Sequence, residues 1–117
     1  MLKKGLRLHT MLTVIRKKST VTTEDFRHFM KNVYGPTYRE LPQTKAYVQH
    51  FVSDLATDGA EPPIDAIVQI SFESEEKMRE ALQADSYRQA AEARKASMQE
   101  TSVGIHPLLI EQTVTMV

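Results

Sequence analysis

The amino-acid sequence predicts an α+β fold in which a four-stranded antiparallel sheet carries helices on one face. The expected elements run strand, helix, strand, strand, helices, strand along 117 residues, a length typical of one domain. Residues 64–73 alternate between apolar side chains and a mixture of polar and apolar ones. Since helices can cover only one face of a sheet, the mixed face predicts a pocket or a surface covered by a partner.

The first strand and helix are predicted from residues 8–17 and from the capping signals behind them. Residues 8–17 are rich in β-branched and apolar side chains, as strands are. Thr22 is a suitable N-cap, and the acidic residues after it suit the positive end of a helix. Gly35 and Pro36 predict that this helix ends at Tyr34. The apolar stripe of the helix consists of Phe26, Phe29, Met30 and Val33.

Two further strands are predicted at residues 45–53 and 64–73. The residues between them, 54–63, contain Asp58-Gly59 and Pro62-Pro63 and therefore form a loop. One face of the third strand is apolar and the other is mixed. The apolar side chains are Ile64, Ala66, Val68, Ile70 and Phe72, and the others are Asp65, Ile67, Gln69, Ser71 and Glu73.

The last third of the chain predicts two helices and a final strand. Ser74 caps the first helix, and Asp85 begins a second one. One side of that second helix carries Tyr87, Ala91, Arg94 and Met98. Residues 106–116 alternate like a strand. The complete order is the split βαβ plan of ferredoxin-like folds.

Composition indicates an ordinary folded domain. Hydrophobic residues make up 41% of the chain and charged residues 26%. The lack of cysteine excludes disulfides, thiolate nucleophiles and cysteine metal sites. No apolar run reaches the roughly 18 residues that a membrane helix needs, so we expect a cytoplasmic protein without membrane association. We expect residues 1–7 to form a short basic lead and residues 8–117 the domain.

Charge is unevenly distributed although the net charge is zero. Residues 1–50 contain ten lysines and arginines against three acidic residues, whereas residues 51–117 contain five against twelve. Either the basic half marks a site for an anion, or the two halves interleave and neutralise each other. Because no basic-aromatic motif accompanies the charge, we expect no nucleic-acid binding.

Metal and cofactor sites are not expected. The four histidines lack the spacing of a metal site. His50 is the best candidate for a haem ligand, but we expect the helices to cover its face of the sheet. The chain has no phosphate-binding glycine loop and no dinucleotide fingerprint. We therefore expect no metal and no cofactor.

The order of several short motifs carries a resemblance that spans residues 11–116. These motifs are Thr23-Glu24-Asp25-Phe26-Arg27-His28-Phe29, Tyr34-Gly35-Pro36, Leu41-Pro42, Tyr47-Val48-Gln49, residues 65–72 and Asp85-Ser86-Tyr87. In this order they resemble the EthD-like family of dimeric α+β barrel proteins. The resemblance implies a ferredoxin-like dimer whose sheets close a barrel around a pocket. It also implies a connection with ether degradation, or with isomerases, cyclases and monooxygenases of polyketide-like aromatics.

One position departs from the family pattern. Relatives usually carry His-Gly-Pro or His-x-Pro at the end of the first helix, where this chain has Tyr34. Tyrosine has an ordinary pKa of about 10, against about 6.5 for histidine. Tyr34 is therefore expected to donate hydrogen bonds rather than act as a general base at neutral pH.

The predicted catalytic residues are Tyr34, Tyr47 and Asp65. The two tyrosines would orient a carbonyl or phenol in an apolar pocket, unless they are ordinary amphipathic core residues. Asp65 would act as a base if it points into a closed barrel, unless it stays solvated at the barrel mouth. The predicted ligand-binding residues are Gln49, Phe51, Ile67 and Gln69.

The sequence thus predicts a homodimer that binds a small hydrophobic carbonyl or aromatic compound. If catalytic, it would be a cofactor-free oxidoreductase, isomerase or cyclase. The alternatives are a non-catalytic accessory protein and a structural dimer. The expected interface is formed by the sheet residues Asp65, Ile67, Gln69 and Ser71, with Leu109, Glu111 and Thr113.

Overall fold

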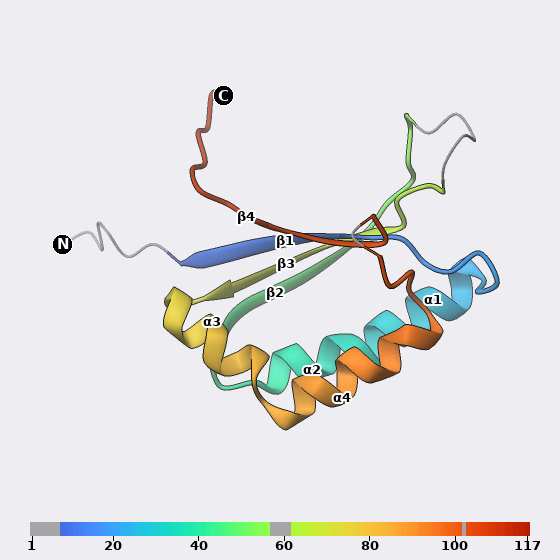
Figure 1. The fold of residues 1–117 in the computed structure, drawn as a ribbon. Helices are drawn as coiled ribbons and strands as arrows, with labels where there is room; N and C mark the ends of the chain where they lie inside the picture. The colour runs from blue at the N-terminus through green and yellow to red at the C-terminus, as the bar shows by residue number, and fades with distance from the viewer. Residues whose placement is uncertain (1–7, 57–61, 102) are drawn as a thin grey trace.

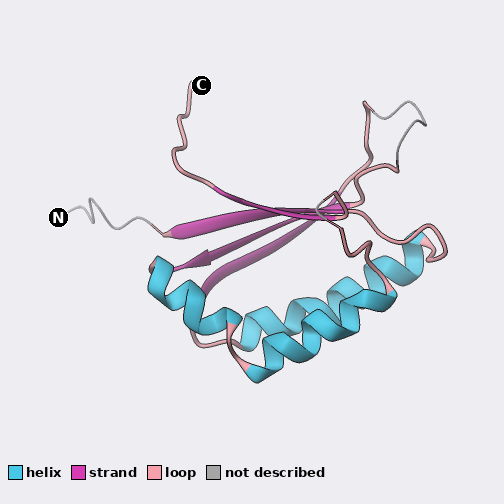
Figure 2. Cartoon of the chain, in the orientation of Figure 1, coloured by secondary structure: helices cyan, strands magenta, loops and turns pink. Residues whose placement is uncertain are grey.

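The computed structural model describes residues 8–56, 62–101 and 103–117. The predicted lead at residues 1–7 and part of the predicted loop, residues 57–61, lie outside the described residues. The elements are β1 (His9–Ile15), α1 (Thr23–Phe29), a π-helical turn (Met30–Tyr34), α2 (Gly35–Glu40), β2 (Thr44–Phe51), β3 (Ala66–Phe72), α3 (Glu75–Leu82), α4 (Asp85–Ala93), a 3₁₀ turn (Arg94–Ala96) and β4 (Ile105–Leu109). All the helices lie on one side of the sheet (Figures 1 and 2).

The sheet has the strand order β2-β3-β1-β4, with every neighbouring pair antiparallel. The predicted four-stranded α+β arrangement is therefore confirmed. The central pair, β1 and β3, is aligned so that Thr13 lies opposite Val68. No helix in the described part of the chain is long and apolar enough to cross a membrane.

The alternation predicted for β3 sets the two faces of the sheet. Ala66, Val68, Ile70 and Phe72 are all buried against the helices. Their partners in the core come from β1, from the helices and from the segments that follow α2 and the 3₁₀ turn. The fully buried large side chains are Phe26, Phe72, Ile15, Met30 and Met98. We call the other face, on which Ile67 and Gln69 lie, the open face.

The helix that begins after Thr22 does not end at Tyr34 as predicted. Thr22 caps it, accepting a hydrogen bond from the Asp25 N–H at 3.1 Å. Pro36 lacks an N–H, and its ring clashes with the carbonyl four residues earlier in a regular α-helix. The backbone instead widens into a π-helical turn, in which the Gly35 N–H bonds to the Met30 carbonyl, and then continues as α2.

A π-helical turn contains one residue more than an α-helical turn, and this rotates the row of buried side chains around the helix. Val33, predicted to be buried, is 47% exposed. The stripe continues from Met30 through Tyr34 and Tyr38, both of which are buried. The π-helical turn therefore places two tyrosines, rather than valine, against the sheet.

Gly35 lies where the helix meets β2 most closely. A β-carbon at this position would lie 2.7 Å from Gln49 Nε2 and 2.8 Å from the Met30 carbonyl oxygen. Gln49 Nε2 donates to that same carbonyl oxygen at 2.8 Å. Only glycine leaves room for this contact, because the carbonyl belongs to the backbone and cannot rotate away.

The final strand is shorter than predicted. β4 ends at Leu109, whereas residues 106–116 were expected to be a strand. Leu109 already pairs with Met11, near the start of β1, and the Ile110 N–H bonds to the Thr10 carbonyl at 3.0 Å. Beyond this point β1 offers almost no further partner, so the alternating residues leave the sheet (Figure 1).

Candidate functional site

A cavity of about 410 Å³ lies between the sheet and the helices. Its sheet side is mostly apolar, as small-molecule sites are. The polar groups are concentrated on the helix side. The lining residues are Met11, Thr13, Ile15, Tyr34, Tyr38, Val68, Ile70, Phe72, Leu82, Tyr87, Arg94, Glu100, Thr101, Ile105 and Pro107.

The other three tyrosines of the chain pack around Tyr38, which lies in α2. The Tyr38 ring meets Tyr34 edge-on at 5.2 Å between centroids and Tyr87 of α4 edge-on at 5.9 Å. On the side of β2, it stacks on Tyr47 at 5.1 Å with the two rings 10° apart. Such aromatic pairs add stabilisation beyond their buried area, and here they support the cavity wall formed by Tyr34, Tyr38 and Tyr87.

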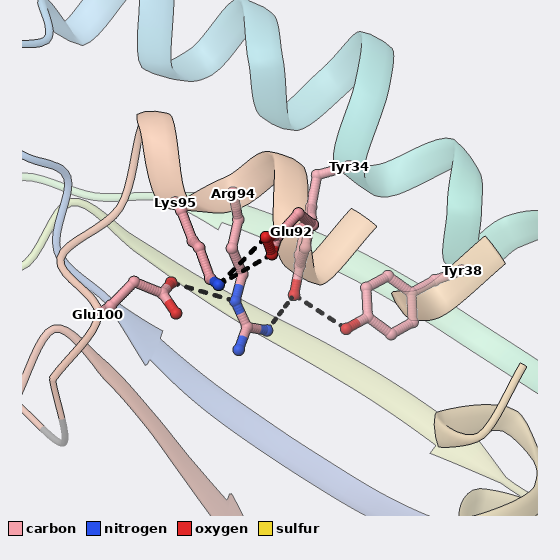
Figure 3. A network of polar contacts seen from close by, with 6 residues as sticks. All are labelled: Tyr34, Tyr38, Glu92, Arg94, Lys95 and Glu100. Carbon is pink, nitrogen blue, oxygen red and sulfur yellow. Dashed lines mark hydrogen bonds and ion pairs between the residues drawn. The ribbon is translucent and has the colours of Figure 1, made fainter. Parts of the chain in front are cut away.

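A chain of hydrogen bonds joins the tyrosines to a cation (Figure 3). The hydroxyls of Tyr34 and Tyr38 are 2.9 Å apart, and Arg94 Nη1 donates to Tyr34 Oη at 3.4 Å. Arg94 Nε donates to Glu100 Oε2 at 3.2 Å. The Arg94 side chain is only 19% exposed. Since a guanidinium stays protonated in proteins, a partly buried positive charge lies at the cavity wall.

Burial raises the pKa of Tyr34, although its bond to Tyr38 and the nearby charge of Arg94 act in the opposite direction. The pKa of Tyr38 is raised well above its usual value by burial and by Tyr34. Burial likewise raises the pKa of Tyr47. At neutral pH these phenols are protonated, so they donate hydrogen bonds and do not act as bases.

The three raised values predict how the protein responds to alkali. A pKa raised by folding contributes stability that is complete below the unfolded value of about 10 and is lost as the pH rises through the folded values. Phenolate absorbance from Tyr34, Tyr38 and Tyr47 should therefore appear only together with the loss of helical circular dichroism. Ionisation of these three tyrosines near their usual pKa in a protein that is still folded would contradict the burial.

The structure places the predicted tyrosines on either side of Tyr38. Tyr34 lines the cavity, whereas Tyr47 does not and instead borders a neighbouring hollow. Gln49 Nε2 donates to Tyr47 Oη at 3.0 Å. Phe51 packs edge-on against Phe26 at 6.5 Å. Tyr47, Gln49 and Phe51 thus lie between the sheet and the first helix, outside the cavity wall.

The other predicted residues do not reach this cavity. Asp65 precedes β3, and its Oδ2 accepts the Lys17 N–H at 2.9 Å, so the carboxylate fixes the end of β1. Ile67 and Gln69 point to the open face, away from the helices. The sheet itself separates them from Tyr34.

His50 lies on the open face, and the expectation that the helices cover it is wrong. It pairs with Ile67 and is exposed, while Tyr47, Gln49 and Phe51 face the helices. Among the described residues, no three His, Asp or Glu side chains come close enough together to hold a metal ion.

Sequence reasoning did not identify Tyr38, Arg94 or Glu100 as site residues. The signal for Arg94 was its position seven residues after Tyr87, on the side of the helix that also carries Ala91 and Met98, because a cation is unusual among apolar side chains. Tyr38 follows Tyr34 by four residues, the spacing of neighbours on one helix face. The assumed helix end at Tyr34 concealed that spacing.

A family model for the EthD domain matches residues 18–99. The chain therefore belongs to the EthD family, as its motifs indicated. A comparison with curated proteins gives no significant match.

Solved structures with low sequence identity share the fold. An EthD family protein from Bacillus halodurans has a TM-score of 0.68 at 11% identity, covering 92% of this chain and 100% of that one. A dimeric ferredoxin-like protein of unknown function from Jannaschia has a TM-score of 0.67 at 13% identity, covering 91% and 100%. SnoaB from Streptomyces nogalater, a cofactor-independent oxygenase crystallised as a mutant, has a TM-score of 0.66 at 11% identity, covering 93% and 96%.

Proposed function

We propose that the chain binds a flat hydrophobic carbonyl or phenolic compound in the cavity and acts on it as a cofactor-free oxidoreductase, isomerase or cyclase. The observation that carries this proposal is the group formed by Arg94, Tyr34 and Tyr38 on the wall of an otherwise apolar cavity. An apolar space with a few fixed donors suits a ligand with one oxygen and a hydrophobic body.

On a carbonyl or phenolic substrate, all three reaction classes have a route through the same kind of intermediate. This is an enolate or phenolate, whose negative oxygen is stabilised by fixed donors. The guanidinium of Arg94 and the protonated hydroxyl of Tyr34 supply such donors. The cavity also has one lining carboxylate, Glu100, which is held by Arg94 and would be the base that removes the proton.

The description of SnoaB as a cofactor-independent oxygenase supports this class of chemistry on this fold. Oxygenation without a cofactor requires a substrate that is itself electron-rich, as an enolate or phenolate is. The donors around Tyr34 are suited to holding such an anion.

A variant of Tyr34 tests the site. Tyr34→Phe keeps the ring but removes one hydrogen bond, so it should weaken the binding of a naphthol by about 0.5–1.5 kcal/mol. Tyr47→Phe should have a smaller effect, because the Tyr47 hydroxyl contacts Gln49 and does not line the cavity. Titration calorimetry measures the affinity of both variants for the naphthol. An equal loss of affinity in the two variants would indicate that the ligand binds nearer to β2 and not in this cavity.

A non-catalytic carrier is the second candidate function. It is favoured by the pairing of Glu100 with Arg94, since this hydrogen bond occupies a carboxylate oxygen that a base would need. No histidine is among the described residues that line the cavity, so none of them replaces Glu100 as a base. A carrier would bind the naphthol as described but leave a bound enolisable ketone unchanged, which hydrogen–deuterium exchange at the α-carbon distinguishes.

The chain is also proposed to form a homodimer through the open face, since similar solved structures are described as dimeric. Val48 and Leu108 on this face are 42% and 46% exposed in the single chain. Leu108 replaces Leu109 in the expected interface, because Leu109 pairs with Met11 and shares its helix-covered face.

A charge at the centre of the open face should separate the dimer. Stable interfaces bury about 1,200–2,000 Å² in total, and Ile67→Arg would place a guanidinium inside such an area. Sedimentation at micromolar concentration should show a dimer for the wild type and a monomer for Ile67→Arg. Leu55→Arg, at a loop position that is 97% exposed, is the matched control and should stay dimeric. A monomeric wild type would refute the interface.

A further inference from the structure

A second hollow, of about 420 Å³, lies on the other side of the stacked pair of Tyr38 and Tyr47. It is formed where the π-helical turn and α2 approach the start of β2. Its base contains the ring of Tyr47 and the backbone around Gly35. The side chain of Gln49 also lines it, but its Nε2 atom is already bonded to Met30 O and Tyr47 Oη.

Three cations from three different elements border this hollow: Lys31 of the π-helical turn, Arg39 of α2 and Lys45 of β2. No acidic side chain is among the described residues that line it. Within the described chain, Lys31 and Lys45 form no ion pair, and Arg39 has only an exposed contact with Glu40 at 3.6 Å. Three of the ten cations of residues 1–50 thus gather here, and no carboxylate of the described residues from the second half lines the hollow.

Two backbone irregularities place these cations around one space. The π-helical turn displaces the residues between Met30 and Tyr34, and it carries Lys31. A bulge in β2 leaves Lys45 as an extra residue between Thr44 and Ala46, which pair with adjacent residues of β3. Both kinds of irregularity redirect side chains and occur often at functional sites. The Oγ1 atom of Thr44, which also lines the hollow, is buried without a hydrogen-bond partner.

We propose that this hollow binds a small organic anion, namely a carboxylate attached to a flat apolar body. The cations surround the carboxylate, and the faces of Tyr47 and Pro36 offer an apolar surface for the attached body. The size of the hollow exceeds that of a simple inorganic ion and fits one or two rings. This site is separate from the cavity beside Arg94 and does not depend on the function proposed for that cavity.

Nuclear magnetic resonance with 2-naphthoate as the probe tests the proposal. Naphthoate should shift the amide signals of Gly35 and Tyr47, and the neutral naphthylmethanol should shift them much less. Replacing two cations, as Lys31→Gln with Lys45→Gln, should weaken naphthoate binding about fivefold or more, and added salt should weaken binding to the wild type. Arg88→Gln removes an exposed cation of α4 that does not line the hollow, and it should bind naphthoate like the wild type.

The outcomes separate the two sites. Arg94→Gln should leave the naphthoate shifts at Gly35 and Tyr47 unchanged, whatever it does to naphthol binding in the cavity. The proposal is overturned if naphthoate shifts only signals of the cavity, such as Tyr87. It is also overturned if the double lysine variant and Arg88→Gln bind naphthoate with the wild-type affinity.

Discussion

Replacing Phe26 by alanine should lower the free energy of unfolding by about 3–5 kcal/mol, the usual cost of removing a buried aromatic side chain. Phe26 is fully buried and meets the Phe51 ring edge-on. Its loss leaves a cavity between α1 and the sheet that the neighbouring strands cannot close. Urea denaturation followed by circular dichroism gives the value.

Val33 provides the matched control in the same helical segment. It was predicted to belong to the buried stripe with Phe26, but it is 47% exposed. Val33→Ala should therefore change the free energy of unfolding by less than about 0.5 kcal/mol. A large loss for Val33→Ala would mean that the π-helical turn is misplaced. A loss below about 1 kcal/mol for Phe26→Ala would mean that Phe26 does not belong to the core.

Replacing Arg94 by glutamine should weaken the binding of an anionic phenol roughly tenfold to a hundredfold. The variant removes a charge-assisted hydrogen bond of about 1.5–3 kcal/mol at a wall where the Arg94 side chain is only 19% exposed. Glutamine keeps most of the side-chain length, so the wall of the cavity stays closed. Titration calorimetry at a pH where the phenol is ionised measures the loss.

Two further variants test whether the positive charge of Arg94 causes the loss of affinity for the phenol. Arg94→Lys should recover part of the affinity, because it keeps the charge but loses the fork of donors. Lys95→Gln removes the neighbouring cation, which forms an exposed pair with Glu92 at 2.8 Å and does not line the cavity, and should bind like the wild type. Equal binding by Arg94→Gln and the wild type would remove Arg94 from the site.

The sheet was predictable because its signals are local. The alternation through Val68 and Ile70 sets which face of β3 is buried. Side-chain caps at Thr22 and Ser74 mark where two helices begin, and the structure contains both capping bonds. These patterns depend on neighbours along the chain, so the order of elements and the antiparallel sheet follow from them.

The course of the first helix was not predictable in the same way. Pro36 signals a helix end in isolation, yet the contact between Gln49 and the Met30 carbonyl supports a π-helical turn that lets the helix continue. Gln49 is distant in sequence, and its role appears only once β2 lies beneath the helix. The same limit applies to the end of β4. The alternation of apolar and polar side chains continues past Leu109, where the pairing with β1 ends.

Only part of the candidate site could be singled out from the sequence, because its residues come from distant segments. Tyr34 could be singled out from its position at a family motif, but Arg94 reaches it from a segment 60 residues later. Asp65 was considered as a base because strand alternation places it on the mixed face. Its carboxylate instead accepts a hydrogen bond from the backbone N–H of Lys17, a contact that no local sequence pattern predicts.

The most direct test of the central claim is the pKa of a phenol bound in the cavity. A nitronaphthol is suitable because its phenol and phenolate forms absorb at different wavelengths. If Arg94 and Tyr34 hold the oxygen of the ligand as an anion, the pKa of the bound nitronaphthol should be lower than in water, and Arg94→Gln should abolish that difference. A bound pKa that is unchanged or raised in the wild type would contradict the account, since it would mean that an apolar wall, and not Arg94, surrounds the oxygen.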